Sequence, residues 1–404
     1  MLKIRKKQFI FYLLLFFICI PGNSSFPTAV NIIRLAFTFI GFGVAMVLFF
    51  RFKYYRRKML LPLIVWFIWI IIATLLNGTD FVGTITDILI PFFSSAMLVV
   101  YLFDNDRENV ISVITWMLTL FMLIQLFSLV THCFGTRFSQ GRFTNVFFMG
   151  IRVNINKLFP FALFFGLINY RFGKKRSPLC LIISTVCGLW FVIVEKVSTS
   201  IIGFVIIVVI LIASRLIKSE HAWRNMAILA ICVGALFAFV YSGSNSFSEW
   251  IFSDTMGEDI TLSGRTRIWE QVIADMKGIH WLIGNGYGHK FMFSLNVFAT
   301  NLTHNQYLEI IFNYGLVGLG VHLWCYVWQF KAMKLAGNKS ASRIFISVFI
   351  ALVFMQIPAA INDWCFYYVF YIATLYLPEI VTVEAAERSR RRIVVRWLPQ
   401  KKGI

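Results

Sequence analysis

Apolar stretches of about 20 residues recur along almost the whole chain, and a helix of that length spans the hydrocarbon core of a bilayer. Of the 404 residues, 59% are hydrophobic and only 14% are charged. Soluble domains carry about 25% charged residues, and a soluble fold of this length could not bury so much apolar surface. The composition excludes a cytosolic enzyme, a disordered chain and a secreted disulfide scaffold. It predicts an all-α, polytopic membrane protein.

Twelve transmembrane helices can be placed on the sequence, within a single integral-membrane domain over residues 1–404. The predicted spans run near 8–21, 29–50, 59–76, 83–103, 109–131, 156–170, 178–195, 200–216, 226–242, 306–330, 344–361 and 364–382. The first span follows the basic segment MLKIRKK and resembles a signal peptide. Because no small-residue cleavage site is clear, we expect this segment to be retained as a helix.

Lysine and arginine predict the orientation of the spans. With the N-terminus inside, the inner segments hold most of the 38 Lys and Arg, including the basic tail at residues 383–404. Positive charge concentrates on the cytoplasmic side of membrane proteins, so both termini are predicted to be cytoplasmic. The net charge of +20 then reflects orientation and contact with anionic lipid, not nucleic-acid binding. The seven cysteines include no CxxC pair, so we expect neither a disulfide framework nor a metal site.

Two predicted outer loops are much longer than the other connections, at residues 131–155 and at 243–305 between the ninth and tenth spans. Loops of that length are usually functional or contain structure of their own. In the second loop, apolar residues from Ile268 to Met276 recur at helical spacing. This pattern predicts an amphipathic helix on the membrane or over the bundle, with Arg265 in its first turn. The glycines of GNGYG (284–288) indicate a turn with close backbone approach, and no acidic residue follows at the distance that a dinucleotide site requires.

A second motif, Thr303-His304-Asn305-Gln306, begins the tenth predicted span with the Thr-x-x-Gln spacing of a capping box. The motif predicts that His304 lies in the first turn of this helix, at the outer surface. Free backbone N–H groups there attract anions and favour a neutral imidazole that can accept a proton. Two interpretations fit the residues equally well: phosphate binding with general-base chemistry, and a histidine solvated among lipid headgroups.

Arginines gather in both outer loops, where positive charge is unexpected, at Arg137, Arg142, Arg152, Arg265 and Arg267. Guanidinium groups bind pyrophosphate oxygens in a bidentate manner, although any one arginine can equally contact lipid phosphates. Several together favour an anionic, lipid-linked substrate.

Charges inside or beside predicted spans are costly and usually have a reason. Arg34 is a candidate partner for Asp87, and Glu195 with Lys196 could fix helix packing or contribute to substrate binding.

Three stretches resemble the bacterial O-antigen ligase and polymerase superfamily of integral-membrane glycan transferases. SGRTRIWEQVIADMKGIHWLIGNGYG resembles the family pattern of Gly-Arg, then Trp, then Gly-x-Gly. THNQYLEIIFNYGLVGL resembles its His-Asn followed by a helix with Gly-x-x-Gly, and GRFTN with VNINKLFPFALF resembles a segment that often reads Asn-Pro-Asn. The resemblance extends from Arg137 to Gly320. Two departures are Asn154-Ile155-Asn156 and KVSTSIIGF, in which Lys196 stands near the place where the family often has Ser-Arg or Ser-Lys.

The resemblance implies an all-helical membrane glycosyltransferase that works without a metal ion, a nucleotide sugar or another cofactor. The donor would be an undecaprenyl-diphosphate-linked oligosaccharide at the outer face of the bacterial cytoplasmic membrane. Membrane lipids, a chain-length regulator and a flippase are candidate partners, and no nucleic acid is expected. By carry-over, the catalytic residues would be His304, assisting the acceptor hydroxyl or the phosphate, and Arg265, binding the diphosphate. The expected substrate-binding residues are Arg142, Arg152, Lys196, Arg267 and Asn305, the first three competing as the second phosphate-binding cation.

Three functions remain open at this stage. The favoured one is a polymerase that joins lipid-linked repeat units into O-antigen, capsule or exopolysaccharide. A ligase that transfers finished glycan to another acceptor would carry the same motifs. A 12-span transporter or flippase predicts similar halves and charges at mid-membrane, whereas here the polar groups concentrate in the two outer loops.

Overall fold

The computed structural model describes residues 6–22, 26–139, 142–173, 178–216, 265–289, 291–292, 299–300, 303–359, 361 and 364–382. The longer helices are α1 (Lys6–Cys19), α2 (Thr28–Arg51), α3 (Leu61–Asn77), α5 (Ser94–Asn105), α6 (Arg107–Thr131), α7 (Phe159–Phe172), α8 (Leu179–Val194), α9 (Ser198–Leu216), α12 (Arg265–Asp275), α14 (Gln306–Ala336), α15 (Lys339–Met355) and α16 (Cys365–Leu375). Shorter helical segments are η1 (Tyr54–Arg56), η2 (Lys58–Leu60), α4 (Phe81–Gly83), the π-helical η3 (Thr84–Phe93), η4 (Arg152–Lys157) and α13 (His280–Ile283).

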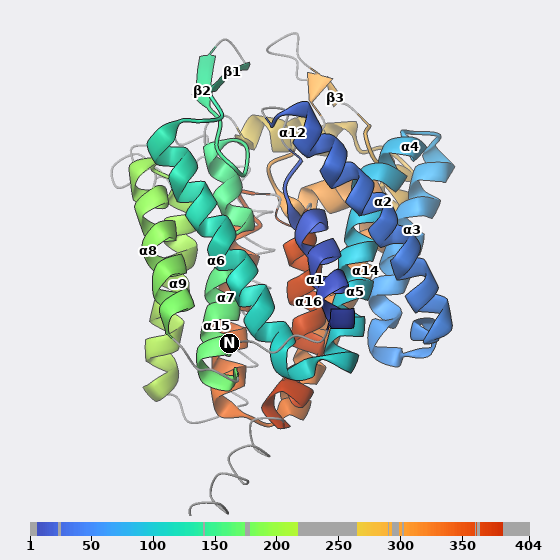
Figure 1. The fold of residues 1–404 in the computed structure, drawn as a ribbon. Helices are drawn as coiled ribbons and strands as arrows, with labels where there is room; N and C mark the ends of the chain where they lie inside the picture. The colour runs from blue at the N-terminus through green and yellow to red at the C-terminus, as the bar shows by residue number, and fades with distance from the viewer. Residues whose placement is uncertain are drawn as a thin grey trace, which may run out of the picture.

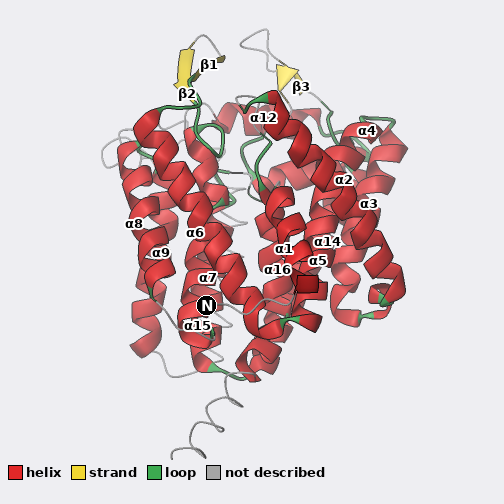
Figure 2. Cartoon of the chain, viewed as in Figure 1, coloured by secondary structure: helices red, strands yellow, loops and turns green. Residues whose placement is uncertain are grey.

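The described part of the chain is helical apart from two short antiparallel hairpins and their connecting loops (Figure 2). Strand β1 (Thr136–Ser139) pairs with β2 (Arg142–Asn145), and β3 (Phe291–Met292) pairs with β4 (Ala299–Thr300). The hairpins lie within the two long loops predicted from the sequence, and the expected all-α class is confirmed. Four-residue and two-residue strands are too short to leave an alternating pattern in the sequence.

Every predicted span except 226–242, which lies outside the described residues, overlaps a helix of the structure. Within the described ranges, five helical stretches could cross a membrane by length and composition: Thr28–Arg51, Lys58–Asn77, Phe81–Asn105, Arg107–Thr131 and Gln306–Ala336. Only 22% of the most apolar window of α2 is buried inside the protein. Its exposed Ile33, Ile40 and Val47 form a surface suited to lipid, because a soluble monomer rarely exposes so large an apolar patch.

The helices form two groups that meet along the centre of the molecule (Figure 1). One group contains α6, α7, α8, α9 and α15, and the other contains α1, α2, α3, α5, α14 and α16. Helix α1 is an integral part of the second group, because the indole of Trp364 donates to the carbonyl of Cys19 at 3.3 Å. Aromatic rings fill much of the core, and the rings of Phe164 and Phe370 join α7 to α16 edge to face at 4.7 Å. Such packing matters because helix association in lipid depends on close contact, not on burial from water.

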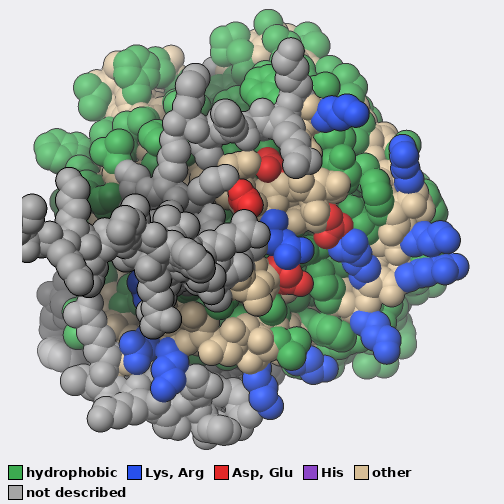
Figure 3. Space-filling model, turned by 60° about the horizontal axis from the view of Figure 1, so that its bottom comes forward, with side chains coloured by type: hydrophobic (Ala, Val, Ile, Leu, Met, Phe, Trp, Pro, Cys, Tyr) green, Lys and Arg blue, Asp and Glu red, His purple; other side chains and the backbone are tan. Residues whose placement is uncertain are grey.

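The two ends of the bundle differ in character. The β1–β2 hairpin, β3 and α12 lie at one end, hereafter the α12 end (Figure 1). The opposite end, hereafter the Arg57 end, carries the connections from α2 to α3, α5 to α6 and α14 to α15. Figure 3 shows this face, where Lys and Arg side chains surround Asp and Glu side chains.

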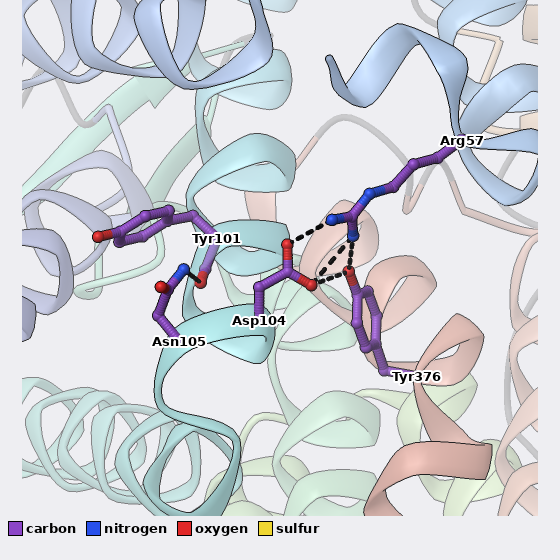
Figure 4. A network of polar contacts seen from close by, with 5 residues as sticks. All are labelled: Arg57, Tyr101, Asp104, Asn105 and Tyr376. Carbon is purple, nitrogen blue, oxygen red and sulfur yellow. Dashed lines mark hydrogen bonds and ion pairs between the residues drawn. The ribbon is translucent and has the colours of Figure 1, made fainter. Parts of the chain in front are cut away.

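An ion-pair network fastens three chain segments together at the Arg57 end (Figure 4). The Arg57 guanidinium grips Asp104 in a bidentate manner, with Nη1–Oδ1 and Nη2–Oδ2 distances of 3.0 and 2.8 Å. The Tyr376 hydroxyl accepts from Arg57 at 2.8 Å and lies 2.9 Å from Asp104 Oδ1. Burial disfavours the guanidinium charge, but the hydrogen bond to Asp104 and the surrounding groups outweigh it and raise the pKa of Arg57. Burial and the charge of Asp104 likewise raise the pKa of Tyr54, so both groups keep their protons at neutral pH.

We predict that Asp104→Asn lowers the free energy of unfolding by about 1 kcal/mol. Hydrogen bonds to charged groups contribute about 1.5–3 kcal/mol, and solvent screening of the partly exposed pair, with side chains 34% and 23% exposed, reduces this figure. Thermal unfolding of the detergent-solubilised protein measures the effect. Arg56→Gln is the matched control, because Arg56 contacts the Tyr55 ring and not Asp104. Equal melting temperatures for the two variants would contradict the prediction.

Candidate active site around the start of helix α14

Helix α14 is broken one-third of the way along its length. Gly315 has φ 69° and ψ −175°, so the amide groups that follow cannot reach the carbonyls of the preceding turn. Carbonyl groups freed inside a membrane-spanning bundle need partners from elsewhere in the protein, since no bulk water reaches them. The residues that supply these partners determine how the surrounding loops are arranged.

The GNGYG loop supplies two of the missing donors through its backbone. Asn285 N donates to the carbonyl of Phe312 at 2.7 Å, and Gly286 N donates to the carbonyl of Asn313 at 2.9 Å. The indole of Trp69 on α3 donates to the carbonyl of Tyr314 at 2.8 Å. The loop is therefore fixed directly onto the break in α14.

The glycines of this loop are required by that close approach. Gly284, Gly286 and Gly288 all have positive φ, between 76° and 79°. A Cβ atom on Gly284 would lie 2.3 Å from the carbonyl carbon of Asn313, and one on Gly315 would lie 2.0 Å from the carbonyl oxygen of Leu282. The close backbone approach predicted from GNGYG is confirmed, and its partner is the break in α14.

The N-terminus of α14 differs from the predicted capping box. Asn305 is the cap, because its side chain accepts hydrogen bonds from Tyr307 N at 3.0 Å and Leu308 N at 3.1 Å. The Thr303 hydroxyl instead closes a tight turn with the backbone of Asn305, at 2.8 and 3.2 Å, and the Gln306 amide oxygen accepts from Ile361 N at 2.7 Å. The predicted Thr303 cap is therefore wrong. The side chain of Asn305 is buried, and its Nδ2 finds no hydrogen-bond partner among the described residues.

His304 lies immediately before the cap, not in the first helical turn. It has φ 54°, in the left-handed region, and its side chain is half-buried. A non-glycine residue in this region is uncommon and costs about 1–2 kcal/mol. The turn of Thr303 and the cap of Asn305 hold this backbone in place from either side.

Helix α12 packs directly on the first part of α14. Trp269 and Val272 of α12, with Met276 directly after the helix, are buried in two apolar clusters that also contain Leu308 and Phe312 of α14. Burying side chains of this size contributes about 1.5–3 kcal/mol each, whereas an isolated helix shorter than about 12 residues is marginal. Packing therefore holds this helix in position, and the helix expected over 268–276 is present.

A hydrogen bond joins α12 to the segment that carries His304. The indole of Trp269 donates to the carbonyl of Thr303 at 2.9 Å, and the contact is buried. Arg265 is the first residue of α12, one helical turn before Trp269 along the same side of the helix. The side chains of Arg265 and Arg267 lie outside the described part of the structure.

The other predicted cations fall into two groups. Arg152 and Lys196 come together at the α8–α9 turn, where Arg152 Nη1 donates to the carbonyl of Glu195 at 3.2 Å, and both side chains are exposed. Asn156 contacts the hydroxyl of Ser200 closely, joining η4 to the start of α9. Arg142 is paired with Ser139 in the β1–β2 hairpin, and its side chain lies outside the described part.

Helix α15 connects this region to the start of α14. Met355, the last residue of α15, packs against Gly203 of α9, where an added Cβ would lie 2.2 Å from the methionine sulfur. The carbonyl of the following Gln356 accepts from Gln306 N at 2.9 Å. The α8–α9 turn and the His304 segment therefore lie at the same end of the bundle.

A cavity of about 240 Å³ lies beside the first turns of α14. It is lined by Trp66, Ile70, Asp87, Ile88, Phe92, Tyr287, Gly288, Gln306, Glu309, Ile310, Asn313, Tyr314 and Tyr368. Two carboxylates, Asp87 and Glu309, and five aromatic side chains thus face one space. The suggested pairing of Arg34 with Asp87 is wrong. Among the described residues, the ion pair with an N–O distance of 4.0 Å or less is the one between Arg57 and Asp104. Asp87 instead accepts a hydrogen bond from the Thr86 hydroxyl at 3.1 Å.

A comparison with known protein families identifies the segment that contains most of this site. Residues 183–323 match the family model described as O-antigen ligase. This segment, hereafter the matched segment, is similar to the O-antigen ligase family over about a third of the chain. The match confirms the resemblance to the O-antigen ligase and polymerase superfamily, whose members are glycosyltransferase-like enzymes of the membrane. A search of curated proteins finds no match to the chain.

The matched segment runs from α8 into α14 and includes the α8–α9 turn, α12, GNGYG and His304. Its match ends one residue after His322, a residue that the sequence analysis missed. His322 is buried, and its Nε2 lies 3.0 Å from the hydroxyl of Tyr326 and 3.3 Å from that of Tyr367. Tyr326 in turn donates to Gln356 Oε1 at 2.8 Å. The sequence did contain a signal for this residue. His322 and Gln329 are polar, lie seven positions apart in one apolar span, and therefore fall on the same face of the helix.

We predict that Gly284→Ala destabilises the protein by several kcal/mol, because buried backbone groups left without partners each cost that much in hydrocarbon. The new Cβ would meet the backbone of α14 and undo the hydrogen bonds that satisfy Phe312 and Asn313. Gly278→Ala is the matched control, since Gly278 has φ 52° but no atom within 4 Å of an added Cβ. The control should lose about 1–2 kcal/mol from backbone strain alone. Thermal unfolding of the purified protein is the measurement, and equal losses in both variants would show that the close approach is unimportant.

Proposed function

We propose that this protein is a polysaccharide polymerase. It would join undecaprenyl-pyrophosphate-linked oligosaccharide repeat units at the outer face of the cytoplasmic membrane. The family match supports glycan transfer, and the buried hydrogen bond from Trp269 to Thr303 is the observation that carries the proposal. That bond ties the helix beginning at Arg265 to the turn containing His304.

The cations act on the donor in this proposal. Arg265 binds the diphosphate of the lipid carrier through its guanidinium fork, with Arg267 on the same helix. Arg152, Lys196 and Arg142 are the candidates for the second cation, and the joining of Arg152 to the turn of Lys196 favours these two over Arg142. The proposal needs no metal ion, because fixed cations can stabilise the charge that develops on the leaving diphosphate.

His304 acts on the acceptor. The acceptor hydroxyl oxygen attacks the anomeric carbon of the donor sugar, and its proton passes to the imidazole. The bond between that carbon and the diphosphate oxygen breaks, and undecaprenyl pyrophosphate leaves with the electron pair. A neutral imidazole suits this role, and the nearby N-terminus of α14 disfavours the imidazolium form.

The distribution of charge supports the orientation. Lys and Arg are prominent at the Arg57 end (Figure 3), which by the positive-inside rule would face the cytoplasm. The α12 end, with His304 and the α8–α9 turn, would then face outward.

We expect His304→Asn and Arg265→Gln each to abolish polymer while the protein still inserts at normal levels. Asparagine tolerates left-handed backbone, so His304→Asn removes the base without straining the turn. The matched controls are His132→Asn, at an exposed residue with φ 50°, and Lys277→Ala, at an exposed cation beyond α12. Polymer length is measured on gels of extracted polysaccharide. Normal polymer in either site variant would refute the role given to that residue.

A deletion strain separates polymerase from ligase. A polymerase deletion should accumulate single repeat units on the lipid carrier, because their joining is the missing step. A ligase deletion should instead accumulate long polymer on the carrier. Mass spectrometry of extracted lipid-linked glycans measures the difference, and long polymer on the carrier would overturn the polymerase assignment.

A further inference from the structure

The cavity beside α14 contains chemistry that the proposed transfer step does not use. Asp87 is exposed and Glu309 and Tyr287 are half-buried, whereas Trp66, Ile70 and Tyr368 are buried. The polar residues therefore stand nearer the opening, and the aromatic and aliphatic residues form the floor.

Asp87 is costly at this position unless it meets a polar partner. It lies in η3, inside the helical stretch Phe81–Asn105 that is apolar enough to cross a membrane. An ionisable side chain in such a stretch faces a water-filled cavity or a substrate path. The π-helical geometry also agrees, since such segments occur often at functional sites.

The cavity opens next to the proposed catalytic residue. The first residue of α14 that lines the cavity is Gln306, two residues after His304. Glu309 Oε2 lies 3.5 Å from the hydroxyl of Thr303, the residue preceding His304. A molecule in the cavity would consequently present its polar groups close to His304.

Charge selects the kind of molecule that fits. Two carboxylates repel a diphosphate, so the donor headgroup does not belong here. Carboxylates accept hydrogen bonds from hydroxyl groups, and the rings of Trp66, Tyr287, Tyr314 and Tyr368 offer apolar surface. Drug-sized ligands occupy about 300–1,000 Å³, so a cavity of about 240 Å³ suits one sugar ring.

We propose that this cavity is the subsite for the terminal sugar of the acceptor glycan. Asp87 and Glu309 bind its hydroxyl groups, and the aromatic floor packs against its ring. The structural argument identifies a sugar subsite, and the identification of that sugar as the acceptor rests on the proposed function.

The test measures binding by the purified, full-length protein in detergent. The first probe is the repeat-unit oligosaccharide released from the lipid carrier of the source strain by mild acid, and the second is undecaprenyl pyrophosphate. Asp87→Asn and Glu309→Gln should each weaken oligosaccharide binding at least tenfold by calorimetry. Ile70→Phe, which fills the floor, should do the same. All three variants should bind undecaprenyl pyrophosphate as the wild type does.

Glu270→Gln is the matched control, because Glu270 is an exposed carboxylate on α12 that does not line the cavity, and it should change neither affinity. Undiminished oligosaccharide binding in the Asp87 and Glu309 variants, or no binding by the wild type, overturns the subsite. An equal loss for both probes overturns it as well, since that indicates general damage.

The failure of the proposed function would look different. His304→Asn should keep full oligosaccharide affinity while losing polymer. If the wild type fails to bind undecaprenyl pyrophosphate, the polymerase proposal fails, whereas oligosaccharide binding that depends on Asp87 still supports a sugar subsite.

Discussion

The hydrogen bonds at the break in α14 are the constraint on which the site depends. A helix interrupted inside a membrane protein leaves carbonyl groups without partners, and each such group costs several kcal/mol in hydrocarbon. Here Asn285 N, Gly286 N and the Trp69 indole satisfy three consecutive carbonyls, from Phe312 to Tyr314. The break is therefore stable only with the GNGYG loop in place, and the loop can reach it only because Gly284 and Gly315 have no side chains.

This arrangement holds the first part of α14, from Gln306 to Tyr314, as a short rigid helix. Each of its sides contacts a different part of the site. Its N-terminus is capped by Asn305 and adjoins His304. One side packs against α12, whose Trp269 reaches back to the carbonyl of Thr303. Another side lines the cavity through Glu309 and Asn313. Because α12 and GNGYG precede α14 in the chain and pack on the same piece, one folded unit brings together the segments that carry the family resemblance.

The sequence predicted features that depend on local patterns and missed those that depend on distant pairing. Apolar runs located the helices, because a span must be apolar along its length. The glycines of GNGYG indicated a close approach, but nothing local identifies Phe312 and Asn313 as its partners. The cap was misassigned because Thr303 and Asn305 are both good capping residues, and the bond from Trp269 to the Thr303 carbonyl favours the observed turn. His322 escaped notice because a neutral histidine adds no charge to an apolar span, and the Arg57–Asp104 pair joins residues 47 positions apart.

A polymerase that handles two similar glycans must distinguish donor from acceptor, and charge offers a direct way to do so. Both glycans present the same sugars, so hydroxyl recognition alone cannot separate them. The donor differs at its reacting end, where the diphosphate carries negative charge. Under the proposed function, cations of the outer loops attract that end, while Asp87 and Glu309 repel it from the cavity. The two carboxylates do not weaken binding of the acceptor glycan, because the hydroxyl groups of its terminal sugar can donate hydrogen bonds to them. The oxygens of the donor diphosphate can only accept hydrogen bonds. Opposite charges on either side of His304 would thus fix the direction in which the two chains meet.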